Sequence, residues 1–125
     1  METKFNFKSQ ICTDKNQSER LLALGLKKET ADCHWKDEAY FDDYEDWNAY
    51  VGSPKHSKHI PAWSLHRLLS LIEYDDGFID VSLRGARYGI HYGYDDGWYD
   101  NLYDAVISCI EALIEEKDFN REYLV

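Results

Sequence analysis

Apolar residues recur at helical spacing in three stretches of the chain. The longest pattern spans residues 101–116, and its apolar positions are Leu102, Ala105, Val106, Cys109, Ile110 and Leu113. A repeat of three to four residues predicts an amphipathic helix, which Asn101 can cap at its start. Ile107 and Ile114 widen the apolar face, so we expect this helix to be the most buried element, with Val106, Cys109, Ile110 and Leu113 almost inaccessible to water.

Two further helices are predicted at residues 14–24 and 62–73. Thr13 or Asp14 can cap the first, and Gly25 can take the left-handed position just past its end. The second begins near Pro61, a residue that the first turn of a helix tolerates. Its buried stripe follows the spacing i, i+3, i+4, i+7 through Leu65, Leu68, Leu69 and Ile72. Residues 28–32 can add one turn, and residues 33–35 then leave it extended.

Strict alternation of apolar and polar residues predicts a β-hairpin between the last two helices. Its strands are residues 78–84 and 87–94, joined by Gly85-Ala86 as a two-residue turn. This turn fixes the register, so that Val81 faces Ile90 on the core side. On the other side Asp80 faces His91, and Ser82 faces Gly89.

Residues 36–59 carry two competing patterns. Trp47, Ala49 and Val51 alternate as in a strand, whereas Asp42 and Glu45 can form a capping box for a short helix that ends at Gly52. We favour the strand. The chain is therefore interpreted as a single α+β domain over residues 1–125: a small antiparallel sheet that contains the hairpin, packed by three helices, with residues 1–9 flexible.

Composition narrows the classes of partner. The chain of 125 residues has 24 acidic and 14 basic side chains and a formal charge of −10. Such a charge disfavours direct contact with nucleic acid or anionic membranes and favours a protein with a basic surface. No signal peptide or membrane-spanning stretch is evident, and three scattered cysteines suggest reduced thiols and a cytoplasmic location. No cofactor motif occurs, so we expect no cofactor.

Residues 37–50 combine six acidic and five aromatic side chains with no basic one. Because carboxylates favour water and rings favour burial, the rings either pack on this protein's own core or contact a partner. We expect at least two of Phe41, Tyr44, Trp47 and Tyr50 to pack on the core. The leading hypothesis is a non-catalytic interaction protein whose candidate partner-binding residues are Asp42, Asp43, Tyr44, Glu45, Asp46 and Trp47.

The alternative hypothesis is a small-ligand module or an enzyme that uses the outer face of the hairpin. Gly89 and Gly93 leave bare positions there, and glycine inside a strand often marks the close approach of another group. A tryptophan or tyrosine of the chain itself can also fill this gap. The candidate residues of this face are Asp80, Arg84, Arg87, Gly89, His91 and Gly93.

Metal binding and nucleophilic catalysis have weak signals. His56, His59 and His66 lie close in sequence, with Cys33-His34 nearby, but Lys55 and Lys58 between them oppose a cation, so no metal site is expected. The two Asp-Asp-Gly turns lack the spacing of calcium loops. Cys12 precedes a helix start, where the helix dipole can lower a thiol pKa, yet no recognisable catalytic motif accompanies it.

Four segments carry a resemblance to a known group of sequences: residues 12–26 (CTDKNQSERLLALGL), 30–32 (TAD), 61–65 (PAWSL) and 104–113 (DAVISCIEAL). Together they resemble a family of small uncharacterised proteins encoded by gut bacteria of the Bacteroides type and by their phages and mobile elements. The resemblance implies an accessory or mobile-element origin and a cytoplasmic location. It implies no activity, cofactor or catalytic residue.

Overall fold

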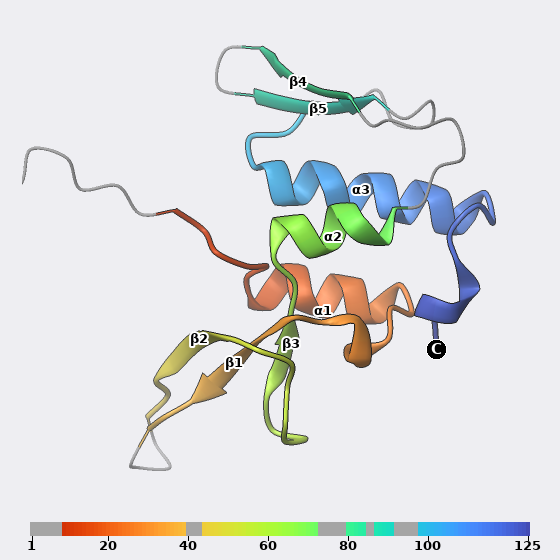
Figure 1. Cartoon of the computed structure of the whole chain (residues 1–125). Coiled ribbons are helices and arrows are strands. Elements are labelled where there is room, and N and C mark those ends of the chain that lie inside the picture. Colours follow the sequence, from red (N-terminus) through yellow and green to blue (C-terminus); the bar gives the residue numbers. More distant parts are fainter. Residues whose placement is uncertain (1–8, 40–43, 73–79, 85–86, 92–97) are drawn as a thin grey trace, which may run out of the picture.

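In the part of the chain that the structure describes, three helices lie between a two-stranded hairpin on one side and a three-stranded sheet on the other (Figure 1). The computed structural model describes residues 9–39, 44–72, 80–84, 87–91 and 98–125. In chain order the elements are α1 (Lys15–Ala23), a 3-10 turn η1 (Lys28–Thr30), β1 (Cys33–Asp37), β2 (Trp47–Val51), β3 (Ile60–Ala62), α2 (Leu65–Leu71), β4 (Asp80–Arg84), β5 (Arg87–His91), α3 (Leu102–Glu115) and a second 3-10 turn η2 (Arg121–Tyr123). The predicted α+β class is confirmed.

Helix α1 begins and ends with the signals expected from its sequence. The Asp14 carboxylate accepts a hydrogen bond from the Gln17 backbone N–H, and the Gln17 side chain in turn accepts one from the Asp14 N–H, a reciprocal capping box. At the other end Gly25 has a φ of 99°. The N–H groups of Gly25 and Leu26 donate to the carbonyls of Leu22 and Leu21, which closes the helix as a Schellman motif.

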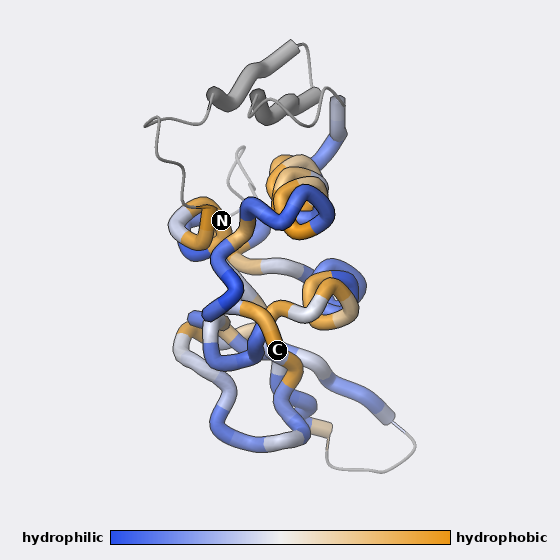
Figure 2. The backbone as a smooth tube through the Cα atoms, turned by 90° about the vertical axis from the view of Figure 1, so that its right-hand side faces the viewer, coloured by the Kyte–Doolittle hydropathy of each residue, from blue (hydrophilic) through white to orange (hydrophobic). Residues whose placement is uncertain are grey.

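Helix α3 supplies the largest share of the core, as the periodicity predicts. Val106 and Ile110 are 0% exposed, and Cys109 and Leu113 are 1% exposed. The Asn101 side chain accepts from the N–H groups of Tyr103 and Asp104 and so caps the helix. Hydrophobic residues of the chain gather on the helices, whereas the loops at the sheet end are mostly hydrophilic (Figure 2).

Helix α2 starts later than predicted. Residues 60–62 form the short strand β3 instead of a first helical turn, and Ser64 caps a helix that begins at Leu65. The physical reason is that residues 60–62 pair with β1 as an edge strand, in which Pro61 lies opposite His34. An edge strand tolerates proline where no N–H has to pair with the neighbouring strand. A proline just before a helix and a proline in an edge strand give the same local signal.

The strands form two separate antiparallel sheets, where the sequence predicted a single sheet. One has the order β2-β1-β3, and the other is the β4–β5 hairpin, which lies against α3. The predicted strand at residues 47–51 is confirmed as β2. The predicted hairpin register is also confirmed: Val81 pairs with Ile90, and Asp80 with His91. The turn 85–86 and residues 78–79 and 92–94 of the predicted strands lie outside the described residues.

Trp63 joins the three-stranded sheet to the helices. Its side chain is 0% exposed, and its indole N–H donates to the Thr30 hydroxyl at 2.9 Å. Its backbone exchanges hydrogen bonds with Thr13, whose N–H donates to the Trp63 carbonyl and whose hydroxyl accepts from the Trp63 N–H. Beyond this junction the sheet rests on a small separate cluster of buried Cys12, Cys33 and Ala62.

Side-chain hydrogen bonds connect residues 12–26, 30–32, 61–65 and 104–113 around this core. The Asp32 carboxylate accepts hydrogen bonds from the Ser64 N–H at 2.8 Å and from the Ser64 hydroxyl at 2.6 Å. On the far side of α1, the Gln17 amide donates to Asp104 at 2.8 Å. These side-chain hydrogen bonds link Asp32, next to β1, to the start of α2, and link α1 to α3.

Candidate interaction surface

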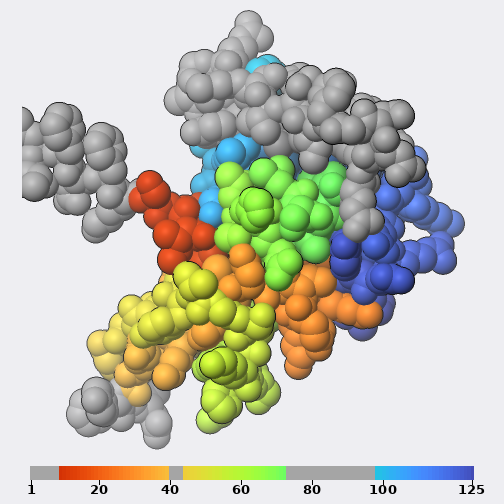
Figure 3. Space-filling model, viewed as in Figure 1, coloured from red at the N-terminus to blue at the C-terminus, as the bar shows by residue number. Residues whose placement is uncertain are grey.

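The acidic and aromatic segment forms the outer part of a hairpin made by β1 and β2. This hairpin and the loop of residues 53–59 protrude from the helical body (Figure 3). Tyr44 and Glu45 are exposed, Asp46 and Trp47 are half-buried, and Asp42 and Asp43 lie outside the described residues. The structure thus places four of the six predicted partner-binding residues at the start of strand β2.

Two of the four rings, of which at least two are expected to pack on the core, are exposed, so that expectation now depends on Trp47 and Phe41. Tyr44 is 55% exposed and Tyr50 is 40% exposed, while Trp47 is half-buried and Phe41 lies outside the described residues. The reason is the small size of the sheet, whose own buried cluster is already covered by Trp35 and Ala49. The ring of Trp47 instead lies under Lys15 of α1, with the ammonium 4.5 Å from the ring centroid.

Carboxylates organise the open end of the hairpin. Asp37 accepts from the backbone N–H groups of Asp46 and Ala39 at 2.9 and 3.1 Å. These two hydrogen bonds hold the pKa of Asp37 below its usual value, so its carboxylate stays charged. Glu38 accepts a hydrogen bond from the hydroxyl of Tyr50, and this contact raises the pKa of that phenol.

A stack of imidazole rings covers one face of the sheet. His34 of β1 is 8% exposed, and its Nδ1 donates to the Gly52 carbonyl at 2.8 Å. His59 stacks on His34 with ring centroids 4.6 Å apart and planes 10° apart, and Tyr50 stacks at 5.8 Å. His56 meets the edge of His59 at 5.0 Å. The sequence signalled the histidines but not this arrangement, because it depends on the path of residues 53–59 across the sheet.

The stacked geometry suits packing better than metal ligation. Ring nitrogens carry their lone pairs in the ring plane, so parallel rings direct them side by side instead of toward one point. Among the described residues, no group of three His, Cys, Asp or Glu side chains is arranged to hold a metal ion. His66, the third histidine of the sequence cluster, is exposed on α2. Burial, together with His34, His56 and Lys36, lowers the pKa of His59.

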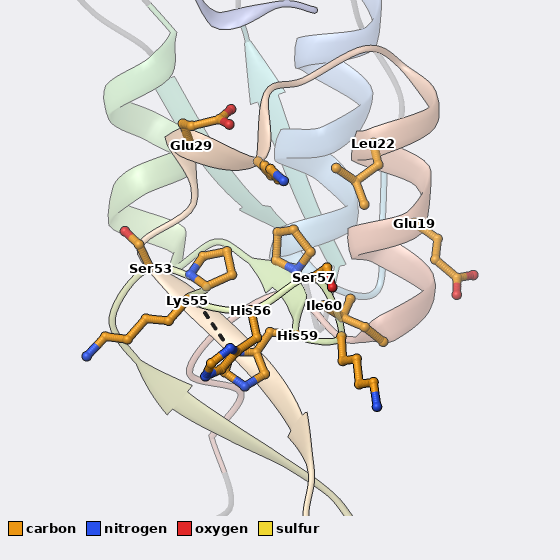
Figure 4. Close-up of a pocket in the computed structure, with 13 residues that line it drawn as sticks. Glu19, Leu22, Glu29, Ser53, Lys55, His56, Ser57, His59 and Ile60 are labelled. Carbon is orange, nitrogen blue, oxygen red and sulfur yellow. Dashed lines mark hydrogen bonds between the residues drawn. The ribbon is translucent and has the colours of Figure 1, made fainter.

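Two open grooves flank the loop of residues 53–59. One, of about 680 Å³, lies between this loop and α1 with η1, and Glu19, Leu22 and Glu29 line its far side (Figure 4). The other, of about 910 Å³, lies between the loop and the hairpin, and its lining includes Tyr44 and Glu45. The exposed part of the predicted segment therefore borders a hollow in the protein surface.

The cysteine expectation needs correction. Burial, with the nearby Cys33 and Asp32, raises the pKa of Cys12 to about 12. The pKa of Cys33 is also raised, first by burial. The predicted influence of the helix start is therefore outweighed by desolvation, and both thiols stay protonated at neutral pH.

The alternative ligand face belongs to the β4–β5 hairpin. The register puts Asp80 opposite His91, Ser82 opposite Gly89, and Arg84 opposite Arg87. Gly93 lies outside the described residues. Five of the six predicted positions therefore lie in pairs of residues that face each other across the two strands.

Comparisons with family models, with curated proteins and with solved structures found no match. In the described part of the chain, no helix is both long and apolar enough to cross a membrane.

Proposed function

We propose that this chain is a non-catalytic interaction protein that binds a basic partner protein through the exposed side chains of the β1–β2 hairpin. The observation that carries the proposal is the exposure of Tyr44 and Tyr50 beside the carboxylates of Glu38 and Glu45. Large exposed rings forfeit roughly 1.5–3 kcal/mol of burial each, which a partner can recover. Tyrosine supplies rigid contact area of the kind that dominates protein interfaces.

Charge supports a basic partner. The hairpin carries Asp37, Glu38, Glu45 and Asp46 on a chain whose formal charge is −10. A surface of one sign accelerates encounter with a partner of the opposite sign and repels like-charged competitors. As part of this proposal, the chain masks a basic nucleic-acid-binding protein or neutralises a basic toxin. We also propose a cytoplasmic location, which the thiol state of Cys12 and Cys33 supports.

The test compares capture of proteins from a lysate of the host cell by three versions of the chain. The first is the native protein, and the second is Glu38→Gln with Glu45→Gln, which removes two hairpin charges and retains the oxygen acceptors. The third is Glu115→Gln with Glu116→Gln, which makes the same charge change on exposed residues at the end of α3. Captured proteins are identified by mass spectrometry after elution with a salt gradient.

We expect the hairpin variant to lose a protein of basic isoelectric point that the native chain and the α3 variant both retain. That protein should elute at moderate salt, because exposed charges are screened within about 10 Å at 0.1 M salt. If all three versions capture the same proteins with the same salt dependence, the hairpin carboxylates do not bind the partner and the proposal is wrong.

A further inference from the structure

The two edges of the three-stranded sheet are protected to different degrees. The β3 edge is only three residues long and contains Pro61, and the chain directly after it is hydrogen-bonded to Thr13. Proline and a covering segment are devices that stop further strands from pairing. The β2 edge has five residues, none of them proline or charged. In the described part of the chain no strand pairs with it.

The hydrogen-bond pattern shows which groups of β2 face outward. The Gly52 N–H donates to the Asp32 carbonyl, and the Glu38 N–H donates to the Asp46 carbonyl, so residues 46 and 52 point their backbone groups toward β1. Backbone direction alternates along an antiparallel strand. Residues 48 and 50 therefore also face β1, and Trp47, Ala49 and Val51 direct their N–H and C=O groups away from the sheet.

Side chains along this edge favour contact with another chain. Val51 is 84% exposed although it is a large apolar residue, and Tyr50 beside it is 40% exposed. Glu45 and Asp46 directly precede the strand. The edge thus has open backbone groups, an apolar side chain at one end and two carboxylates at the other.

We propose that strand β2 accepts an extended segment of a basic partner protein, which adds to the sheet as a fourth strand. This inference rests on the proposed function and specifies its mode of binding. Main-chain hydrogen bonds to Trp47, Ala49 and Val51 hold the segment, and side chains at alternate positions give specificity. The partner segment alternates apolar residues, which pack on Val51, with lysine or arginine residues, which lie on the opposite face and pair with Asp46. A second copy of this chain is disfavoured as the occupant, because each copy carries a formal charge of −10.

The test uses the full chain labelled with nitrogen-15 and two synthetic peptides, one of alternating lysine and valine and one of alternating glutamate and valine. Amide hydrogen exchange and chemical shifts are followed by NMR at millimolar peptide. We expect the lysine peptide, and not the glutamate peptide, to slow exchange at the outward amides of Trp47, Ala49 and Val51.

A matched pair of variants separates backbone pairing from charge. Val51→Pro removes one outward N–H without removing a bond to β1, whereas Val51→Thr keeps the N–H and nearly the same shape. We expect Val51→Pro to bind the lysine peptide at least about tenfold more weakly, a loss of about 1.4 kcal/mol, and Val51→Thr to bind it as the native chain does. A lysine peptide with alternate backbone amides N-methylated provides the same test without changing the protein.

The outcomes distinguish the two proposals. If Val51→Pro and the methylated peptide bind normally while Glu38→Gln with Glu45→Gln weakens binding, strand addition is wrong and the proposed function stands. If neither peptide perturbs the β2 amides, strand addition is also wrong. If the native chain is a dimer that Val51→Pro converts to a monomer, the occupant is a second copy of the chain, which overturns the proposal of a basic partner strand.

Discussion

Replacing Asp32 with alanine tests how strongly the sheet is joined to α2. The Asp32 carboxylate accepts two hydrogen bonds from Ser64, one from the backbone N–H and one from the hydroxyl. Hydrogen bonds to charged groups contribute about 1.5–3 kcal/mol each. Asp32 is half-buried, so water replaces part of the lost interaction. We therefore expect Asp32→Ala to lower the free energy of unfolding by about 3 kcal/mol, which is the sum of two bonds at the lower end of this range.

The loss is measured by thermal and urea unfolding. An unfolding entropy near 2.1 cal/mol/K per residue gives about 0.26 kcal/mol/K for this chain, so the melting temperature should fall by about 10 °C. Glu29→Ala is the matched control, because it removes an exposed carboxylate from the preceding turn. We expect that control to change stability by less than about 0.5 kcal/mol.

A double-mutant cycle with Ser64→Ala isolates the contact between the two side chains. The hydroxyl also caps α2 by accepting from the Arg67 N–H, and the cycle subtracts this separate contribution. We expect a coupling of about 1–2 kcal/mol between Asp32 and the Ser64 hydroxyl. A coupling near zero, or a melting temperature equal to that of the Glu29 control, would refute the view that this carboxylate joins sheet and helix.

Three further predictions concern pH, helix ends and thiols. The pKa of His59 is lowered from its ordinary value of 6.5, so the unfolded state binds more protons below that pH. Stability should therefore fall as pH drops below about 6.5, and urea titrations of His59→Gln should show a smaller fall, with exposed His66→Gln as the control. Gly25 and Lys117 occupy equivalent positions after α1 and α3, with φ values of 99° and 61°. Gly25→Ala should lower the free energy of unfolding by about 1–2 kcal/mol, and Lys117→Gly should raise it by about 1 kcal/mol. Equal effects of the two substitutions in urea unfolding would contradict this reasoning. Because the pKa of Cys12 is raised to about 12, a thiol reagent at neutral pH should modify it far more slowly in the folded chain than in denaturant, and equal rates would show that burial does not protect it.

The helices and the hairpin register could be predicted because their signals are local. The apolar period of α3, the cap at Asp14 and the glycine after α1 each act within one or two turns of the chain. The Asp80–His91 pairing follows from alternation on both sides of a short turn. Each of these features depends on neighbours in sequence.

The remaining features could not be predicted because they depend on distant pairing. Residues 60–62 carry no strand pattern in the sequence. They form a strand because they pair with β1, which lies far away in the chain. Burial of the rings of Tyr44 and Tyr50 depends on how much core the sheet offers, which follows from pairing between distant strands and not from any local pattern. The strand at residues 47–51 could be predicted, because the alternation at Trp47, Ala49 and Val51 is again local.

The unequal size of the two buried clusters has a consequence for local unfolding. Among the described residues, the core that the helices share contains fifteen buried residues, whereas the sheet rests on Cys12, Cys33 and Ala62. Proteins open in cooperative units whose stability follows the contacts that each unit buries. We therefore expect the sheet to open and close while the helices remain folded. A partner strand bound along β2 would then hold this unit closed, and the concentration of that partner would set the fraction of molecules in which the sheet is ordered.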